Sequence, residues 1–384
     1  MEAWPVLPTS ALDYDLPPGL IAVRPVSPRD SARMLVIDRA APDRVQDREV
    51  RDLPDLLGER DLLVFNTTRV LPARFHGERI GTGGKMEGLF LRDTGRGTPG
   101  EEWVALIRGR HTRTGAAFAI FDRAGGPSGI GLHVTGRPDG EPGAWTVRVE
   151  GAAGRTSAEV LGFVGSTPLP PYILRARRSA QLPQDEPEDP ERYQTVYADA
   201  PGSVAAPTAG LHFTDDLLSR LRRAGVARAD VLLHVGAGTF RPVETEFIEE
   251  HVMHAECCSM NGDAIGAVRR AREAGGRVIA VGTTAARTLE SHAPVIDGSG
   301  PPPPDLWTRL LITPGYRFRW VDGILTNFHL PRSTLLAMVA ALFEEGVGPL
   351  KRAYAHAIAK GYRFYSYGDA CLIVEGGTRG PATG

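Results

Sequence analysis

Short apolar runs separated by Pro, Gly and Asp residues open the chain. Residues 34–37 and 62–65 are continuous apolar runs of strand length. Between residues 70 and 160, six further short segments are rich in apolar and β-branched residues, with no helical periodicity among them. These segments are Leu71–Phe75, Met86–Leu91, Trp103–Ile107, Ala117–Phe121, Gly131–Val134 and Trp145–Val149. Their spacing predicts a small β-barrel or β-sandwich.

Beyond residue 200 the pattern changes to strands that alternate with helices. Leu217, Leu218 and Leu221 repeat at helical spacing, and the apolar strand 231–233 follows them. Residues 277–281 form another strand-like run, with helical patterns before and after it. Such alternation predicts an α/β fold with a mixed sheet and helices, interrupted by an inserted small β-barrel-like domain. We place the two parts of the α/β domain at 1–69 and 161–384 and the insertion at 70–160.

An arm at residues 166–201 links the two patterns. It is rich in Pro and in charged residues, a composition typical of surface loops. We therefore expect either a mobile surface loop or a segment with a functional role.

Composition indicates a folded globular protein. The chain has 384 residues, 42% of them hydrophobic, and 44 basic side chains against 46 acidic ones, which gives a net charge of -2. It contains no apolar stretch of the roughly 18 residues that a membrane span needs, no signal-peptide pattern at its start, and only three cysteines. These features predict a cytoplasmic protein.

Arginine dominates the basic residues. Only Lys85, Lys351 and Lys360 are lysine, so 44 − 3 = 41 are arginine. A GC-rich genome explains such a bias, and anion recognition by guanidinium groups is the alternative. A net charge near zero gives no overall electrostatic case for nucleic-acid binding.

Five of the ten histidines lie in turn-like segments, beside Gly, Thr, Glu or Asn. They are His212, His234, His251, His254 and His329. Four loops that follow strands or precede helices carry most of them: 205–214, 234–242, 281–290 and 326–334. Because open α/β sheets bind ligands at the carboxyl ends of their strands, we expect these loops to converge on one site. The G-x-G within 234–242 is a weak dinucleotide signal, since it lacks a third glycine in register.

The segment from His251 to Cys258 resembles a metal site only superficially. Its H-x2-H-x-E-C-C spacing matches no common zinc pattern, and the chain has no second cysteine pair. We predict no metal and assign polar recognition or proton transfer to this segment.

Several stretches together resemble the S-adenosylmethionine:tRNA ribosyltransferase-isomerase family of queuosine biosynthesis. They run in order from about residue 13 to 374 and are Tyr14–Pro17, Asp61–Arg74, Gly83–Glu87, Pro168–Ile173, Glu191–Thr214, His234–Pro242, Glu250–Glu256, Val281–Ser291, Pro314–Thr334 and Tyr362–Ile373. The resemblance implies an α/β domain with an inserted β-barrel-like domain, as the patterning predicts.

The resemblance also implies an activity. S-adenosylmethionine would donate its ribosyl moiety to the aminomethyl group of 7-aminomethyl-7-deazaguanine in tRNA, giving epoxyqueuosine in tRNA, adenine and methionine. S-adenosylmethionine is then a co-substrate, and no separate cofactor is expected. The partners are S-adenosylmethionine and this tRNA, with no membrane and a monomer as the expected state.

Such chemistry needs a proton acceptor, a proton donor for adenine and a pocket for the methionine carboxylate. A sulfonium acidifies the neighbouring C5′ protons, so that a base can form an ylide there. We assign acid–base work to His212, His234, His254 or His329, with Glu256 as the leading carboxylate.

Substrate contacts are expected from both sides of the site. For the acceptor, the candidates are Asn66, Arg69, Arg74, Lys85 and Glu87, although Arg69 and Glu87 could equally form an ion pair. For the donor and the loops around it, the candidates are Thr208, Gly210, Phe213, Gly236, Gly238, Thr239, Gly282, Thr283, Thr284, Arg287, Glu290, Asn327, Phe328 and Thr334. The arginine runs 108–113 and 175–178 could contact a phosphate backbone, or could be solvated surface.

The sequence departs from the family pattern at a few positions. Cys257 and Cys258 replace an aromatic pair, Ala285 and Ala286 replace Ser-Val, Thr67 replaces Asp, Gly88 replaces an apolar residue, and a Pro near Gly109 is absent. Because of these departures, the chain could also be a diverged paralogue that transfers the ribosyl moiety to a small-molecule amine or deazapurine. A non-catalytic tRNA-binding protein and a metal hydrolase are also compatible with the sequence.

Overall fold

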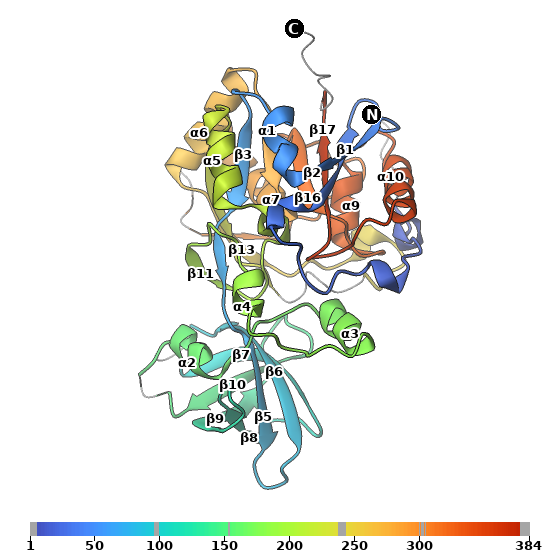
Figure 1. Cartoon of the computed structure of the whole chain (residues 1–384). Helices are drawn as coiled ribbons and strands as arrows, with labels where there is room; N and C mark the ends of the chain where they lie inside the picture. The colour runs from blue at the N-terminus through green and yellow to red at the C-terminus, as the bar shows by residue number, and fades with distance from the viewer. Residues whose placement is uncertain are drawn as a thin grey trace.

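The chain folds into a layered α/β part and a smaller all-β part below it (Figure 1). The computed structural model describes residues 6–95, 100–152, 154–236, 243–298, 300, 303 and 305–376. The predicted α/β class, with a mixed sheet and helices, is confirmed. No helix within these ranges is both long and apolar enough to cross a membrane.

A nine-stranded mixed sheet is the centre of the α/β part. Its order is β15 (Leu306–Thr308), β13 (Glu256–Ser259), β12 (Ala227–Leu233), β3 (Leu62–Asn66), β14 (Val278–Val281), β16 (Gly323–Asn327), β17 (Ala370–Val374), β1 (Arg33–Asp38) and β2 (Val45–Glu49). The neighbours β12, β3, β14 and β16 are parallel. Their carboxyl ends therefore meet at one edge of the sheet, where a ligand site is expected.

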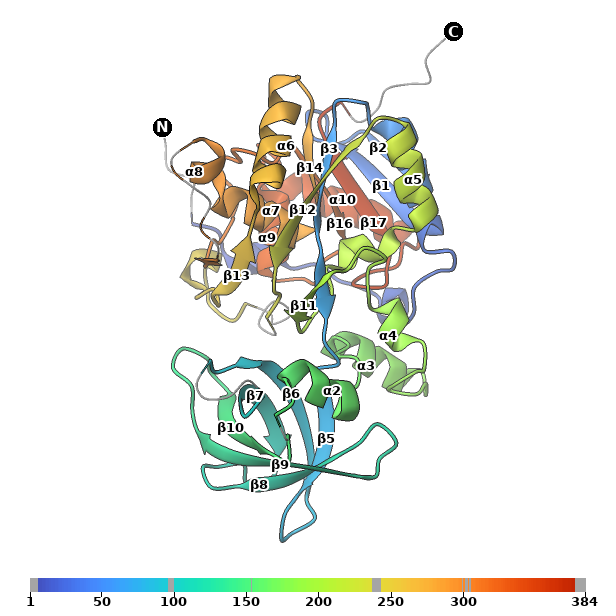
Figure 2. The ribbon, with the colours of Figure 1, turned by 90° about the vertical axis from the view of Figure 1, so that its left-hand side faces the viewer.

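Helices cover both faces of this sheet, which is why its central strands are continuous apolar runs rather than alternating ones. Leu62 and Val64 of β3 pack with α6 (Gly262–Glu273), α7 (Thr283–Ser291), α9 (Thr334–Ala340) and α10 (Val347–Ala359). Leu63 and Phe65 point to the opposite face and pack with α1 (Leu53–Leu56) and α5 (Asp215–Arg223). Figure 2 shows α6 and α7 on one side of the sheet and α5 on the other.

The all-β part is a ring of six antiparallel strands, and the ring is closed. In order around the ring the strands are β10 (Ala144–Glu150), β7 (Glu102–Gly109), β6 (Lys85–Asp93), β5 (Arg74–Arg79), β8 (Ala117–Phe121) and β9 (Pro127–Gly136). Phe75, Phe90, Trp103 and Phe118 fill its interior. The helix α2 (Ser157–Val164) packs against the same core.

Gly88, one of the departures from the family pattern, has a packing reason in this barrel. A Cβ at this position would lie 2.1 Å from the ring of Phe75, so any side chain there would displace that ring. The glycine of β6 therefore makes room for the phenylalanine of β5.

The arm is a folded segment rather than the surface loop that its composition suggested. It contains α3 (Pro171–Ser179) and α4 (Asp189–Arg192), and the strand β11 (Ala200–Ser203) begins at its end and pairs with β4 (Thr68–Val70). Arg177 is fully buried and holds both carboxylate oxygens of Asp189 at 2.6 Å. Glu186 pairs with Arg24 and Arg192 in the same network. These ion pairs place the arm at the junction of the two parts (Figure 1).

Candidate functional site

The carboxyl edge of the parallel strands faces the barrel (Figure 2). A pocket lies at this edge. Seven residues that the sequence predicted as site residues line it: Thr208, Gly282, Thr283, Thr284, Asn327, Phe328 and His329. They come from three of the four predicted loops. The expected convergence of those loops is therefore found.

The amino terminus of α7 forms one wall of the pocket. Gly282 precedes the helix at φ +90°, a conformation that glycine adopts without strain, and no side chain caps the helix there. The first backbone N–H groups of a helix have no partner within it, and the helix dipole favours a negative group at this end. Thr283 and Thr284 add hydroxyl groups beside them. This wall has the chemistry to hold a carboxylate.

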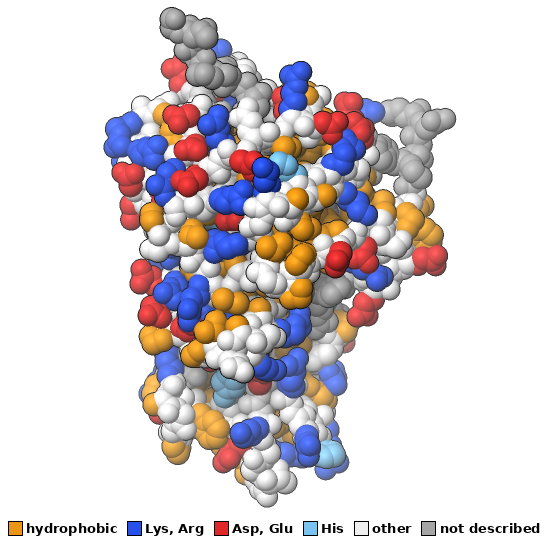
Figure 3. All heavy atoms as spheres, turned by 45° about the vertical axis from the view of Figure 1, so that its right-hand side comes forward, with side chains coloured by type: hydrophobic (Ala, Val, Ile, Leu, Met, Phe, Trp, Pro, Cys, Tyr) orange, Lys and Arg blue, Asp and Glu red, His pale blue; other side chains and the backbone are white. Residues whose placement is uncertain are grey.

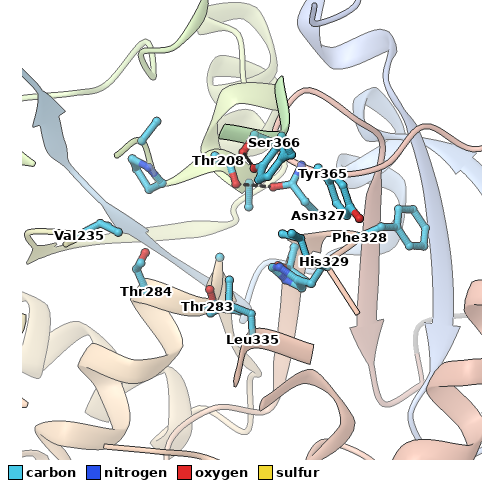
Figure 4. A pocket seen from close by; sticks show the side chains of 17 residues that line it. Thr208, Val235, Thr283, Thr284, Asn327, Phe328, His329, Leu335, Tyr365 and Ser366 are labelled. Atoms are coloured by element: carbon cyan, nitrogen blue, oxygen red, sulfur yellow. Dashed lines mark hydrogen bonds between the residues drawn. The ribbon is translucent and has the colours of Figure 1, made fainter. Parts of the chain in front are cut away.

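A second wall is a chain of hydrogen bonds between loops. Thr208 Oγ1 donates to Asn327 Oδ1 at 2.8 Å, which Figure 4 shows, and Asn327 Nδ2 lies 3.2 Å from His212 Nε2. Because an amide nitrogen only donates, His212 Nε2 accepts this bond. Asn327 thereby links the loop that follows β16 to the loop that contains His212.

His329 lies in the pocket wall and is fixed from several directions. Its Nε2 is 2.8 Å from the hydroxyl of Thr326, its backbone N–H donates to the hydroxyl of Tyr354 at 2.9 Å, and its carbonyl accepts from Tyr14. The imidazole is thus held in one orientation at the end of β16.

Burial keeps both of these histidines neutral. Desolvation lowers the pKa of His329 to about 3, and desolvation together with the nearby Arg363 and Arg29 lowers the pKa of His212 to about 3. At neutral pH each ring is therefore a neutral imidazole, in which one nitrogen donates a hydrogen bond and the other accepts one.

His234 belongs to a neighbouring cluster rather than to the pocket lining. Its Nδ1 is 3.0 Å from the hydroxyl of Thr68, and burial lowers its pKa. The fully buried Asn66 lies beside Thr68 and donates to Leu233 O at 3.0 Å and to Thr284 Oγ1 at 3.2 Å. Both donors of this amide are used inside the protein. Asn66 therefore positions Thr284 and does not face an acceptor substrate, which corrects the prediction from the sequence.

Glu256 forms a buried ion pair with Arg287. One carboxylate oxygen accepts from Arg287 and the other from the backbone N–H of Gly236 at 3.0 Å. The side chains of Glu256 and Arg287 are 5% and 3% exposed. The anion that Arg287 binds is thus an internal carboxylate, which anchors the loop after β12 to α7.

Other predicted contacts lie outside the pocket. The carboxylate of Glu290 accepts from Tyr316 and from the backbone N–H groups of 319–321, so it anchors that loop. Phe213 is a core residue, and Gly210 leaves room for Tyr197, whose hydroxyl would lie 1.9 Å from an added Cβ. Thr334 follows Ser333, the residue that caps α9. Glu290, Phe213 and Gly210 therefore have structural roles, whereas a ligand contact of Thr334 stays a prediction.

Three further predicted residues are not placed at the pocket wall. His254 is half-buried two residues before Glu256. Gly238 and Thr239 lie outside the residues that the structure describes.

The predicted acceptor residues separate into different places. Arg74 and Glu87 line a second cavity at the junction of the two parts, with Arg108. Arg69 instead donates to the carbonyls of Ala198 and Asp199, so the alternative Arg69–Glu87 ion pair is wrong. Lys85 is exposed at the start of β6.

Sequence reasoning missed the pocket residues that come from the arm and from the C-terminal segment. They include Tyr172, Tyr365 and Ser366, and the hydroxyls of Tyr172 and Ser366 are hydrogen bonded to each other. Tyr365 has φ +72°, which is strained for a bulky residue and is held by a bond from its N–H to Phe328 O at 3.1 Å. The available signal was that the stretches 168–173 and 362–373, which contain these residues, both lie within the family resemblance.

No cluster of three or more His, Cys, Asp and Glu side chains suited to a metal ion occurs among the described residues. The two adjacent cysteines lie on β13, where Cys258 is buried and Cys257 contacts Asp305.

The pocket thus has the form of a small-molecule site at the carboxyl edge of an open α/β sheet, with a helix amino terminus that no side chain caps and the fixed imidazole of His329. Comparison with known proteins agrees with this class and makes it specific. The chain belongs to the family described as queuosine biosynthesis protein, whose sequence model matches residues 9–373.

Curated relatives span nearly the whole chain. The S-adenosylmethionine:tRNA ribosyltransferase-isomerases of Moorella thermoacetica and Methylobacterium sp. are 45% and 48% identical, each over 94% of this chain and 98% and 97% of their own lengths. The crystal structure of an S-adenosylmethionine tRNA ribosyltransferase from Thermotoga maritima is similar, with a TM-score of 0.50 and 31% identity, over 95% of this chain and 100% of that one.

Proposed function

We propose that this chain is an S-adenosylmethionine:tRNA ribosyltransferase-isomerase. It transfers and isomerises the ribosyl moiety of S-adenosylmethionine onto 7-aminomethyl-7-deazaguanine in tRNA, giving epoxyqueuosine and releasing adenine and methionine. The observation that carries the proposal is identity of 45% and 48%, over almost the full length, to two enzymes with this name. A full-length match favours the same reaction over a diverged paralogue or a non-catalytic tRNA-binding protein.

The pocket at the sheet edge is the proposed donor site. The methionine carboxylate of S-adenosylmethionine would lie at the amino terminus of α7, where Thr283 and Thr284 line the pocket. The sulfonium and ribose would then extend toward Asn327 and His329 on the opposite wall. S-adenosylmethionine serves as a co-substrate, and no separate cofactor is needed.

His329 is the proposed proton acceptor for the C5′ position. Among the described residues, it is the only one of the predicted acid–base groups that lines the pocket. A neutral imidazole can accept a proton, and the Thr326 hydroxyl at its Nε2 fixes which way the ring faces. His212 acts through Asn327, as a positioning residue.

We further propose that residues 70–160 act as an inserted domain that approaches the tRNA. The closed six-stranded ring and its separate core support this division. The proposed reaction takes place in the cytoplasm, by a monomer.

The test is incubation of the purified chain with S-adenosylmethionine and tRNA that carries 7-aminomethyl-7-deazaguanine. Adenine and methionine should both appear, in equal amounts, and only with this tRNA; the same tRNA with guanine at that position is the control. Release with a small-molecule amine in place of tRNA would support the paralogue instead. No release under any condition would contradict catalysis.

A further inference from the structure

A second cavity lies between the barrel and the α/β part, with a volume of about 280 Å³. Apolar side chains form most of its lining, among them Leu89 and Leu106 from the barrel, Leu174 from α3 and Val204 after β11. This volume is several times the roughly 30 Å³ that one water molecule takes up in the liquid, so a ring system can enter.

The strand register shows why one face of the barrel forms this wall. Leu89 of β6 is paired with Leu106 of β7, and Glu87 is paired with Arg108. Arg74 of β5 is opposite Leu89. Directly opposed residues of antiparallel strands share a face, so an apolar pair and a charged pair lie next to each other on the outside of the barrel.

The charged groups of this wall have unused hydrogen-bonding capacity. Arg74 is 5% exposed and pairs with Asp185, but its Nε has no hydrogen-bond partner among the described residues. Its Nη1 is 4.0 Å from the carboxylate of Glu87, which is beyond hydrogen-bond distance. No described donor is hydrogen bonded to Glu87, whose side chain is 38% exposed. A carboxylate accepts two parallel N–H bonds, and a guanidinium donates to a carbonyl.

Neighbouring residues of the same two segments line the two cavities. Val204 and Ala205 line the junction cavity, whereas the next residues, Ala206 and Pro207, line the donor pocket. In the arm, residues 168–171 line the junction cavity and Tyr172 lines the donor pocket. Since consecutive Cα atoms are about 3.8 Å apart, the two cavities are neighbours along both of these segments.

We propose that the junction cavity takes up a planar heteroaromatic base swung out of a single-stranded RNA loop, and that Glu87 reads the edge of that base that carries ring and exocyclic N–H donors. The apolar walls sandwich the ring, and Arg74 or Arg108 donates to its ring carbonyl. A 2-amino-4-oxopyrimidine edge, as guanine has, offers this pattern of donors and acceptor. The inference rests on the proposed function, which supplies the tRNA as substrate. It adds the cavity that binds the base and the residue, Glu87, that selects it.

The test compares the affinities of two tRNAs, one carrying 7-aminomethyl-7-deazaguanine and the other abasic at the same position. We define the base preference as the ratio of the two dissociation constants. Glu87→Gln should reduce this preference about 10- to 100-fold, because hydrogen bonds to a charged group are lost. Leu174→Trp, which fills the cavity, should reduce it similarly. Affinity for the abasic tRNA should not change.

Matched controls are Glu78→Gln, an exposed glutamate on β5, and Leu91→Trp, a leucine of β6 beyond the cavity. Both should keep the wild-type preference. Binding of S-adenosylmethionine shows that each variant is folded, and if Leu174→Trp fails to fold, the Glu87→Gln and Glu78→Gln pair decides alone. An unchanged preference in Glu87→Gln would overturn the inference. Absence of adenine release by the wild type would instead overturn the proposed function, so the two failures are distinguishable.

Discussion

The buried imidazole of His329 makes a quantitative prediction about the pH dependence of stability. Its pKa is about 3 in the folded protein and 6.5 in the unfolded chain. The unfolded chain therefore binds a proton between these values that the folded protein does not, and stability falls as the pH falls through this window. At pH 5, which is about 1.5 units below the unfolded pKa, proton uptake by His329 on unfolding lowers the free energy of unfolding by about 2 kcal/mol relative to pH 8.

The perturbation that isolates this contribution is His329→Gln, whose amide nitrogen or oxygen can replace Nε2 in the bond to Thr326. Urea unfolding of the wild type and the variant is measured at pH 8 and at pH 5. Between pH 8 and pH 5, the free energy of unfolding of the wild type should fall by about 2 kcal/mol more than that of the variant. This difference does not depend on how much the substitution itself destabilises the protein at pH 8. His111→Gln, at an exposed turn position, is the control. Equal losses in wild type and His329→Gln would refute the reasoning and show that the ring is charged or solvated in the folded protein.

Three further predictions follow from the ion pair, the helix terminus and the arm. Glu256→Gln leaves Arg287 buried without its anionic partner and should lower the free energy of unfolding, measured in urea, by about 3–5 kcal/mol. The double variant Glu256→Gln/Arg287→Met should lower it by less, and a loss below about 1 kcal/mol in Glu256→Gln would contradict a buried ion pair. Gly282→Ala forces alanine to φ +90°, so it should lower the free energy of unfolding by about 1–3 kcal/mol. It should also weaken the binding of S-adenosylmethionine, which calorimetry measures. An unchanged affinity would exclude this loop from the proposed donor site. If Arg175 and Arg178 contact phosphates, replacing both with Gln should reduce the magnitude of the slope of the logarithm of the tRNA association constant against the logarithm of the salt concentration by about 1.4–1.8. An unchanged slope would show that the two arginines do not contact the tRNA.

Local patterning was sufficient for the elements whose environment is simple. The fully apolar run of β3 predicted a strand, and in the structure both faces of this strand are covered by helices. The alternating segments predicted the barrel strands within a few residues. The first of them was placed at Leu71 although β5 begins at Arg74, because Leu71 bonds to Ser203 after the arm, a partner that periodicity cannot reveal.

The donor pocket was predictable only where a loop directly follows a strand. Asn327 is the last residue of β16, and Thr283 follows β14 after one glycine, so the convergence of these parallel strands brings both residues together without further information. Glu290 sits one turn further along α7 than Arg287, yet its partners belong to the loop 316–321. Whether a buried carboxylate binds a ligand or a distant loop depends on tertiary packing, which the sequence pattern does not contain.

The arginine content has a structural component that the composition could not show. Arg177 and Arg287 are buried and matched by internal carboxylates, and Arg74 is held by Asp185, so these guanidinium groups add nothing to the attraction of a polyanion. On the face that Figure 3 shows, basic side chains are dispersed among acidic ones, in agreement with the net charge of -2.

Several exposed arginines that form no ion pair among the described residues lie on, or directly after, elements that line the junction cavity. Arg108 is at this cavity, Arg110 and Arg113 follow it at the end of β7, and Arg175 and Arg178 lie on α3, the helix that supplies Leu174 to the opposite wall. Unpaired positive charge therefore flanks the cavity whose walls suit a base. Phosphate contacts fix the position of an RNA strand and base contacts select its sequence. A nearly neutral protein can thus bind one tRNA loop, provided that some of its unpaired exposed arginines lie beside the cavity proposed to read the base.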